Sequence, residues 1–128
     1  MADYISHMRS NNFYTTDETK LEEIIECFPK LKLNKNDNGS YTIYGDDTAG
    51  ITDDEGEFKS YEDLYAAAED LQKILPDNEA LILQEIGHEK YRYLTSCAMI
   101  ITKTDTEYLN LQTWALKKAR KLLKDADY

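Results

Sequence analysis

The spacing of the apolar residues changes several times along the chain, and these changes limit the folds that it can adopt. A helical period occurs in 21–28, 61–75 and 111–122, whereas 31–33 and 41–44 alternate on either side of a polar turn. The segment 80–101 contains continuous apolar runs, which are typical of central strands. The resulting order is helix, hairpin, helix, three strands and helix. It predicts an α+β domain, in which three helices pack on an antiparallel sheet of about five strands.

Local signals mark the ends of two of these helices. Thr15 and Glu18 match a capping box, and Pro29 ends the first apolar run. Ser60 is expected to cap the second helix, and Pro76 follows its last apolar residue. Both helices therefore have boundaries that agree with their apolar period.

The size and composition of the chain favour one folded unit. It has 128 residues, of which 41% are apolar and 31% charged, with only five Gly and two Pro. A chain of this length buries roughly two thirds of the surface that it exposes when unfolded. Because no linker or repeat divides the sequence, we expect a single domain over 1–128, in which 1–12 could form a flexible arm.

Cysteine usage and hydropathy indicate an intracellular setting. Cys27 and Cys97 lie among apolar residues, as buried free thiols in a reducing compartment do. The N-terminal stretch lacks the apolar core of a signal peptide, and no run approaches the roughly 20 residues of a membrane-spanning helix. We therefore expect a cytoplasmic protein.

Charge is distributed unevenly along the sequence. The formal net charge is −10, which disfavours direct binding to nucleic acids and favours basic partners. Residues 44–89 hold fourteen carboxylates against two lysines, a net charge of −12, whereas residues 91–128 hold seven bases against four acids. Such acids can serve solubility alone. The alternative is that they act together on one exposed side of the molecule.

The stretch from 44 to 63 has eight acidic side chains against one lysine, Lys59. It also contains two tyrosines, a residue type enriched at protein interfaces because it buries a large area at a low entropic cost. Packing into the core is the alternative role for these tyrosines. We predict a partner-binding set that consists of Tyr44, Asp46, Asp47, Asp53, Asp54, Glu55, Glu57, Tyr61, Glu62 and Asp63.

Metal-binding and catalytic motifs are incomplete. The stretch from Asn34 has Gly39 at the sixth position of an EF-hand loop, but Gly45 stands where a bidentate carboxylate is required, so a hairpin turn explains it better. His88 and Cys97 could meet across neighbouring strands, although apolar residues surround the thiol. No zinc pattern or phosphate-binding loop occurs. The sequence therefore predicts a protein that is not an enzyme, with no cofactor and no bound metal.

The stretch "ALILQEIGHEKYRYLTSCAMIIT", together with the closing "ALKKARKLL", resembles small acidic accessory proteins of phages and mobile elements from low-GC Gram-positive bacteria. The resemblance covers residues 79–123 and assigns no role to an individual residue. It implies an anti-defence factor of the anti-CRISPR or anti-restriction type. Several such proteins present carboxylates in place of DNA phosphates.

Composition and resemblance lead to one main hypothesis. The chain is expected to be a non-enzymatic inhibitor of a basic, nucleic-acid-binding host defence protein, which it engages through an acidic surface that mimics DNA. The alternative is an accessory protein that binds a small ligand or a nucleotide through the basic C-terminal helix and the tyrosines of the sheet. An accessory role unrelated to defence also stays open.

Overall fold

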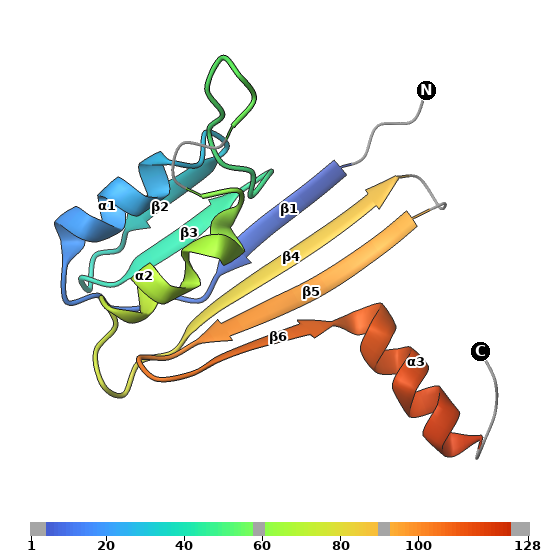
Figure 1. The fold of residues 1–128 in the computed structure, drawn as a ribbon. Helices are drawn as coiled ribbons and strands as arrows, with labels where there is room; N and C mark the ends of the chain where they lie inside the picture. The colour runs from blue at the N-terminus through green and yellow to red at the C-terminus, as the bar shows by residue number, and fades with distance from the viewer. Residues whose placement is uncertain (1–4, 58–60, 90–92, 124–128) are drawn as a thin grey trace.

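The computed structural model describes residues 5–57, 61–89 and 93–123. Its centre is an antiparallel sheet of six strands in the order β2-β3-β1-β4-β5-β6 (Figure 1). The strands are β1 (Ile5–Ser10), β2 (Leu31–Lys35), β3 (Tyr41–Gly45), β4 (Leu81–Glu89), β5 (Tyr93–Ile101) and β6 (Thr106–Asn110). The helical segments are α1 (Glu18–Glu26), the 3-10 helix η1 (Leu64–Ala67), α2 (Ala68–Gln72) and α3 (Leu111–Leu122).

The predicted α+β class is confirmed, and the sheet has six strands rather than about five. The additional strand is β1, which lies within the segment considered as a flexible arm and pairs with both β3 and β4. Its inward residues are Ser6, Met8 and Ser10, so only one of them is strongly apolar. The alternation that normally reveals a strand is therefore weak in this segment.

Strand register divides the side chains between two faces of the sheet. Met8 pairs with Glu85, and Glu85 pairs with Cys97, so these three side chains point to the same face. The next row along the strands is Lys32, Tyr44, Arg9, Gln84, Ala98 and Leu109, which points to the opposite face. We call the first side the helix face and the second the open face.

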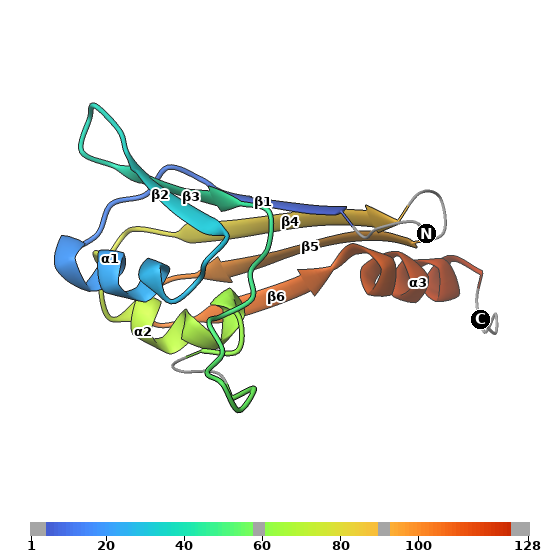
Figure 2. The same ribbon diagram turned by 90° about the horizontal axis from the view of Figure 1, so that it is seen from above.

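The helices α1, η1 and α2 all lie on the helix face (Figure 2). One hydrophobic cluster fills the space between these layers. It includes Leu21 and Ile24 of α1, Leu71 of α2, and Leu83 and Ile101 of the sheet, and each of these side chains is buried. The single cluster explains why this part of the chain folds as one unit.

The first two helices begin later than the sequence predicts. Asp17, rather than Thr15, caps α1, and its carboxylate accepts a hydrogen bond from the Lys20 N–H at 3.0 Å. The Thr15 hydroxyl instead donates to the Ile74 carbonyl at 2.8 Å, which ties the start of α1 to the end of the second helical segment. Asp63 caps η1, while Ser60, the predicted cap, lies outside the described residues.

The third helix forms where predicted but differs from the others in its packing. Asn110 caps α3 through a hydrogen bond from the Thr113 N–H to its side chain at 3.1 Å. The helix continues beyond the end of β6, and none of its residues, all of which the structure describes, is buried (Figure 1). It therefore does not cover the sheet as α1 and α2 do.

Two further expectations concern cysteines and membranes. Cys27 is half-buried and Cys97 is buried, and both are free thiols, as predicted. Among the helices of the described ranges, none is long and apolar enough to span a bilayer.

Candidate functional site

Most of the predicted acidic site lies in the loop between β3 and η1. Residues 53–57 form a tight turn at its tip, closed by a backbone hydrogen bond from the Asp53 N–H to the Glu57 carbonyl at 2.8 Å. The Asp53 carboxylate accepts hydrogen bonds from the N–H groups of Glu55 and Glu57 at 3.0 and 2.9 Å. Gly56 adopts a positive φ of 85°, which the turn requires. Asp53 therefore shapes the turn, and Asp54, Glu55 and Glu57 project from it.

Three other acids of the predicted set also have local partners. Asp47 accepts a hydrogen bond from the Ala49 N–H, and Asp63 accepts one from the Ala66 N–H. Asp46 lies 3.2 Å from Nδ1 of His7 on the neighbouring strand β1, where both side chains are exposed. These three carboxylates therefore stabilise local structure, in addition to any contact that they make with a partner.

Four carboxylates of the set have neither an ion pair nor a hydrogen bond among the described residues. Asp54, Glu55, Glu57 and Glu62 are exposed, and no ion pair in the described part of the chain reaches them. Because their charges are not compensated locally, they contribute fully to the negative potential around the loop.

The two tyrosines of the set are not brought together with these acids. The Tyr61 ring stacks on Phe28 with 5.8 Å between ring centroids, and its hydroxyl donates to the Asp70 carboxylate. Burial, with the Asp70 carboxylate nearby, raises the pKa of Tyr61 to about 12. Tyr44 is exposed on the open face, whereas the tip of the acidic loop lies on the side of the helices (Figure 2). Tyr61 is thus half-buried against the core, and Tyr44 belongs to the opposite side of the sheet.

The carboxylates of the described strands and helices are distributed unevenly between the two sides of the sheet. The solvent side of α1 carries exposed Glu22, Glu23 and Glu26, and α2 adds Glu69. On the open face, Glu107 is the only carboxylate among the strand residues that the structure describes. The acidic loop and the helices therefore give one side of the molecule a strong negative charge, whereas on the open face the described strands contribute only Glu107, and Asp46 lies beside His7.

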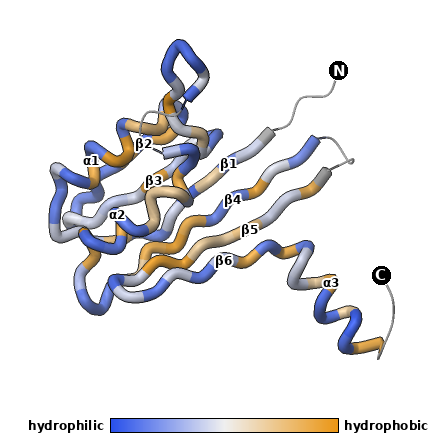
Figure 3. Tube along the Cα trace, viewed as in Figure 1, coloured by the Kyte–Doolittle hydropathy of each residue, from blue (hydrophilic) through white to orange (hydrophobic). Residues whose placement is uncertain are grey.

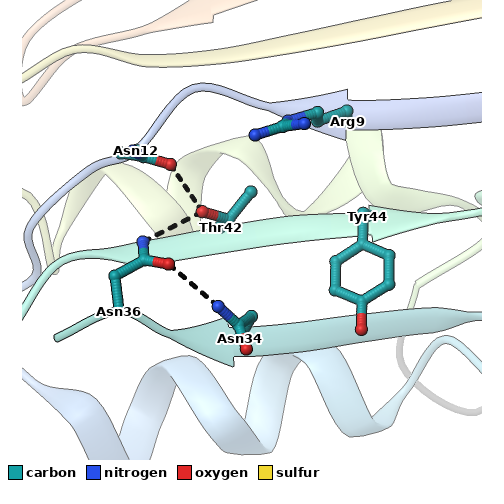
Figure 4. Close-up of a pocket in the computed structure, with 6 residues that line it drawn as sticks. All are labelled: Arg9, Asn12, Asn34, Asn36, Thr42 and Tyr44. Atoms are coloured by element: carbon teal, nitrogen blue, oxygen red, sulfur yellow. Dashed lines mark hydrogen bonds between the residues drawn. The ribbon is translucent and has the colours of Figure 1, made fainter.

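The open face contains a polar hollow of about 420 Å³ between β2, β3 and β1. It is lined by Arg9, Asn12, Asn34, Asn36, Thr42 and Tyr44 (Figure 4).

Hydrogen bonds between side chains hold one wall of this hollow in place (Figure 4). The Thr42 hydroxyl donates to Oδ1 of Asn12 at 2.6 Å and accepts from Nδ2 of Asn36 at 3.1 Å. Nδ2 of Asn34 donates to Oδ1 of Asn36 at 2.8 Å. The wall is therefore fixed before any ligand arrives, which lowers the entropic cost of binding.

The cation of the hollow is Arg9. It pairs across the strands with Tyr44 and Gln84, and no carboxylate within the described ranges lies within ion-pair distance of it. A guanidinium group with open space before it can bind a phosphate or carboxylate in two-pronged geometry. The sequence did not reveal this hollow, because β1 was not expected and because the stretch from Asn34 was interpreted as a hairpin turn in preference to a calcium loop.

A second polar cluster lies on the helix face. The Tyr65 hydroxyl donates to the Glu85 carboxylate at 2.7 Å, and Sγ of Cys97 lies 3.7 Å from the same hydroxyl. Tyr108 packs edge-on against Tyr65 with 5.8 Å between ring centroids. Burial, followed by the hydrogen bond to Glu85, raises the pKa of Tyr65 well above its ordinary value. A thiol held in this way is shielded rather than exposed for reaction.

The pairing of His88 with Cys97 that the sequence allowed does not occur. His88 pairs with Leu94 and points to the open face, whereas Cys97 points to the helix face. Among the described residues, no group of three or more His, Cys, Asp or Glu side chains is arranged to hold a metal ion. The clearest sites in the structure are therefore the acidic loop and the Arg9 hollow.

No family model, curated protein or solved structure matches this chain.

Proposed function

We propose that the chain is a non-enzymatic inhibitor of a basic, nucleic-acid-binding defence protein, and that its acidic side takes the place of a phosphate backbone. The observation that supports this proposal is the separation of charge, which leaves Asp54, Glu55, Glu57 and Glu62 exposed on the same side as the acidic helices, with no ion pair to another residue of the described ranges. Duplex DNA carries one charge per roughly 1.7 Å of its axis, and only a surface with dense, uncompensated carboxylates can imitate it.

The turn at 53–57 offers a direct test of this mechanism. The triple variant Asp54→Asn, Glu55→Gln, Glu57→Gln removes three charges and keeps Asp53, which shapes the turn. We expect the affinity for the partner to fall about tenfold, because three exposed charge pairs at roughly 0.5 kcal/mol each amount to one decade. Protection of phage or plasmid DNA is measured in a Gram-positive host that carries a CRISPR or restriction system and expresses the chain.

A matched control is available on α1. The variant Glu22→Gln, Glu23→Gln, Glu26→Gln removes the same charge from exposed positions outside the loop. Its loss of protection should be clearly smaller than that of the loop variant. Equal losses would contradict a specific role of the loop, and a wild-type chain that protects in none of these hosts would contradict the inhibitor proposal itself.

A second candidate function follows from the Arg9 hollow. Its cation, its exposed tyrosine ring and its fixed amide wall suit a small anion with a planar group, such as a nucleotide. The negative charge of the molecule opposes such a ligand, but Asp46, a carboxylate on the same face, is paired with His7. This candidate differs from the sequence hypothesis in its site, because the ligand would bind at β1 and β3 and not at the basic helix.

Thermal unfolding in the presence of nucleoside phosphates tests this candidate. A ligand at one hundred times its dissociation constant stabilises a protein by about 2.7 kcal/mol, which gives a measurable rise in Tm. We expect Arg9→Gln to abolish the rise and Lys20→Gln, on the helix side, to leave it unchanged. The absence of a rise with any nucleotide, or a rise that survives Arg9→Gln, would contradict the assignment.

A further inference from the structure

The exposed apolar side chains of this chain are concentrated at one end. Nine of the thirteen large apolar side chains that are exposed in the described residues come from β4, β5, β6 and α3, and a tenth, Leu123, follows directly after α3. Figure 3 shows the corresponding hydrophobic segments on these strands and at the end of α3. We call this region the β6–α3 surface, and define it by Leu94, Ile100, Leu109, Leu111, Trp114 and Leu122.

The apolar residues of α3 are more exposed than is usual for an amphipathic helix. α3 carries an apolar stripe that includes Leu111, Trp114 and Leu122, and these side chains are 47%, 46% and 81% exposed. The helix is nevertheless held in place, because Asn110 caps it and the Gln112 side chain donates to the Leu94 carbonyl. An amphipathic helix normally buries its apolar stripe, and an exposed patch of this kind marks a surface that another molecule covers.

The two edges of the sheet differ in their protection. β2 carries Lys32 and Lys35, and α1 packs beside it. Edge lysines of this kind hinder pairing with another strand. β6, at the other edge, contains neither Lys nor Pro, has Glu107 as its single charge and has no strand on its outer side among the described residues. Its outer backbone groups are therefore available to a partner strand.

We propose that the β6–α3 surface binds a second copy of this chain, with the two β6 strands paired antiparallel. Antiparallel pairing of a strand with its own copy follows a two-fold axis, so the same surface serves both partners. In this arrangement the C-terminal end of one β6 lies beside the N-terminal end of the other. Each α3 then continues past the start of the partner's β6, beside the partner's turn between β5 and β6, and this end of the partner supplies the missing cover for Trp114.

Charge complementarity supports a second copy as the occupant. α3 presents Lys117, Lys118 and Lys121, whereas Asp105 and Glu107 lie at the start of β6. Since antiparallel pairing brings the end of one β6 beside the start of the other, the lysines of each copy approach these two acids of its partner. The basic helix of each copy thus lies beside acidic residues of the other copy, which reduces the electrostatic repulsion between two strongly acidic chains.

The mass of the full chain in solution tests this proposal directly. Light scattering over a concentration series should give a particle of twice the 14.8 kDa chain mass, which dissociates on dilution. Trp114 is the only tryptophan, so its emission should shift to shorter wavelengths as the dimer forms and shield its ring. A particle of single-chain mass across the whole series would overturn the proposal, even if another protein binds this surface.

Two independent variants locate the contact. Leu109→Lys and Trp114→Lys alter exposed side chains, so folding measured by circular dichroism should stay intact while the mass falls to that of one chain. The control is Tyr14→Lys outside the β6–α3 surface, where Tyr14 is 45% exposed, compared with 46% for Trp114, and this variant should remain a dimer. Folded lysine variants that keep the dimeric mass would overturn the proposed surface. The acidic-loop variant should not change the mass, so this inference and the proposed function fail separately.

Discussion

At the scale of single residues, the contact between Tyr65 and Glu85 places a carboxylate under the helix layer. Glu85 is half-buried, and the Tyr65 hydroxyl donates to it at 2.7 Å. A carboxylate that loses its donor in such a place retains the cost of its desolvation. Removal of the Tyr65 hydroxyl should therefore destabilise this part of the protein.

We expect Tyr65→Phe to lower the free energy of unfolding by about 1.5–3 kcal/mol, the usual range for a hydrogen bond to a charged group. The pKa of Tyr65 is raised in the folded state, so the stabilisation is fully present below the ordinary tyrosine pKa of 10.0 and is lost as the pH rises above it. The difference between wild type and variant should therefore shrink in alkaline solution. Urea unfolding at several pH values measures this effect. The exposed Tyr14→Phe serves as the control, and a difference independent of pH would contradict the assignment.

At the scale of elements, the acidic loop is anchored by a close contact between backbones. The Gly50 N–H donates to the Glu62 carbonyl at 2.9 Å, and a Cβ atom at position 50 would lie 1.8 Å from the Tyr61 carbonyl oxygen. Only glycine allows this approach, since backbone atoms on the far side cannot move aside as a flexible side chain can. The loop is therefore fixed at its base as well as at its tip.

The substitution Gly50→Ala tests this anchor. It should lower the free energy of unfolding by about 1–3 kcal/mol, the usual cost of inserting a methyl group into a packed site. It should also speed proteolysis of the loop, because the contact with residues 61 and 62 must open. Ala49→Ser, at the exposed neighbouring position, should change neither measurement. A stability equal to wild type for Gly50→Ala would show that the two backbones are not in contact.

Elements with a strong local signal were predicted from the sequence. The apolar period located α1 and α3, and the turn residues after Asn34 located the hairpin of β2 and β3. β1 was missed because Ser6 and Ser10 occupy inward positions where apolar residues are usual. These serines are accepted there because the Ser10 hydroxyl accepts a hydrogen bond from the Ile43 N–H at 2.8 Å, a contact that depends on tertiary structure.

At the scale of the whole molecule, the candidate site could be predicted only in part. The acidic stretch is evident in the sequence, but the sequence does not distinguish Asp53 and Asp63, which hold backbone N–H groups, from Asp54 and Glu55, which face solvent without a partner among the described residues. It also grouped Tyr44 with these acids, because proximity in sequence does not reveal on which face of a strand a side chain lies. The distribution of carboxylates between the two faces depends on strand register. The register of the sheet becomes known only when β1 is placed between β3 and β4.

The unlike edges of the sheet have a consequence for how far association can proceed. A strand edge that stays free after pairing lets further chains add one by one, and growth of this kind produces fibres. In the proposed dimer, the β6 edge of each copy is paired with the other copy. At the β2 edge, Lys32, Lys35 and α1 hinder the addition of another strand. Assembly therefore closes at two copies, and the chain avoids polymerisation without a protective strand at either end.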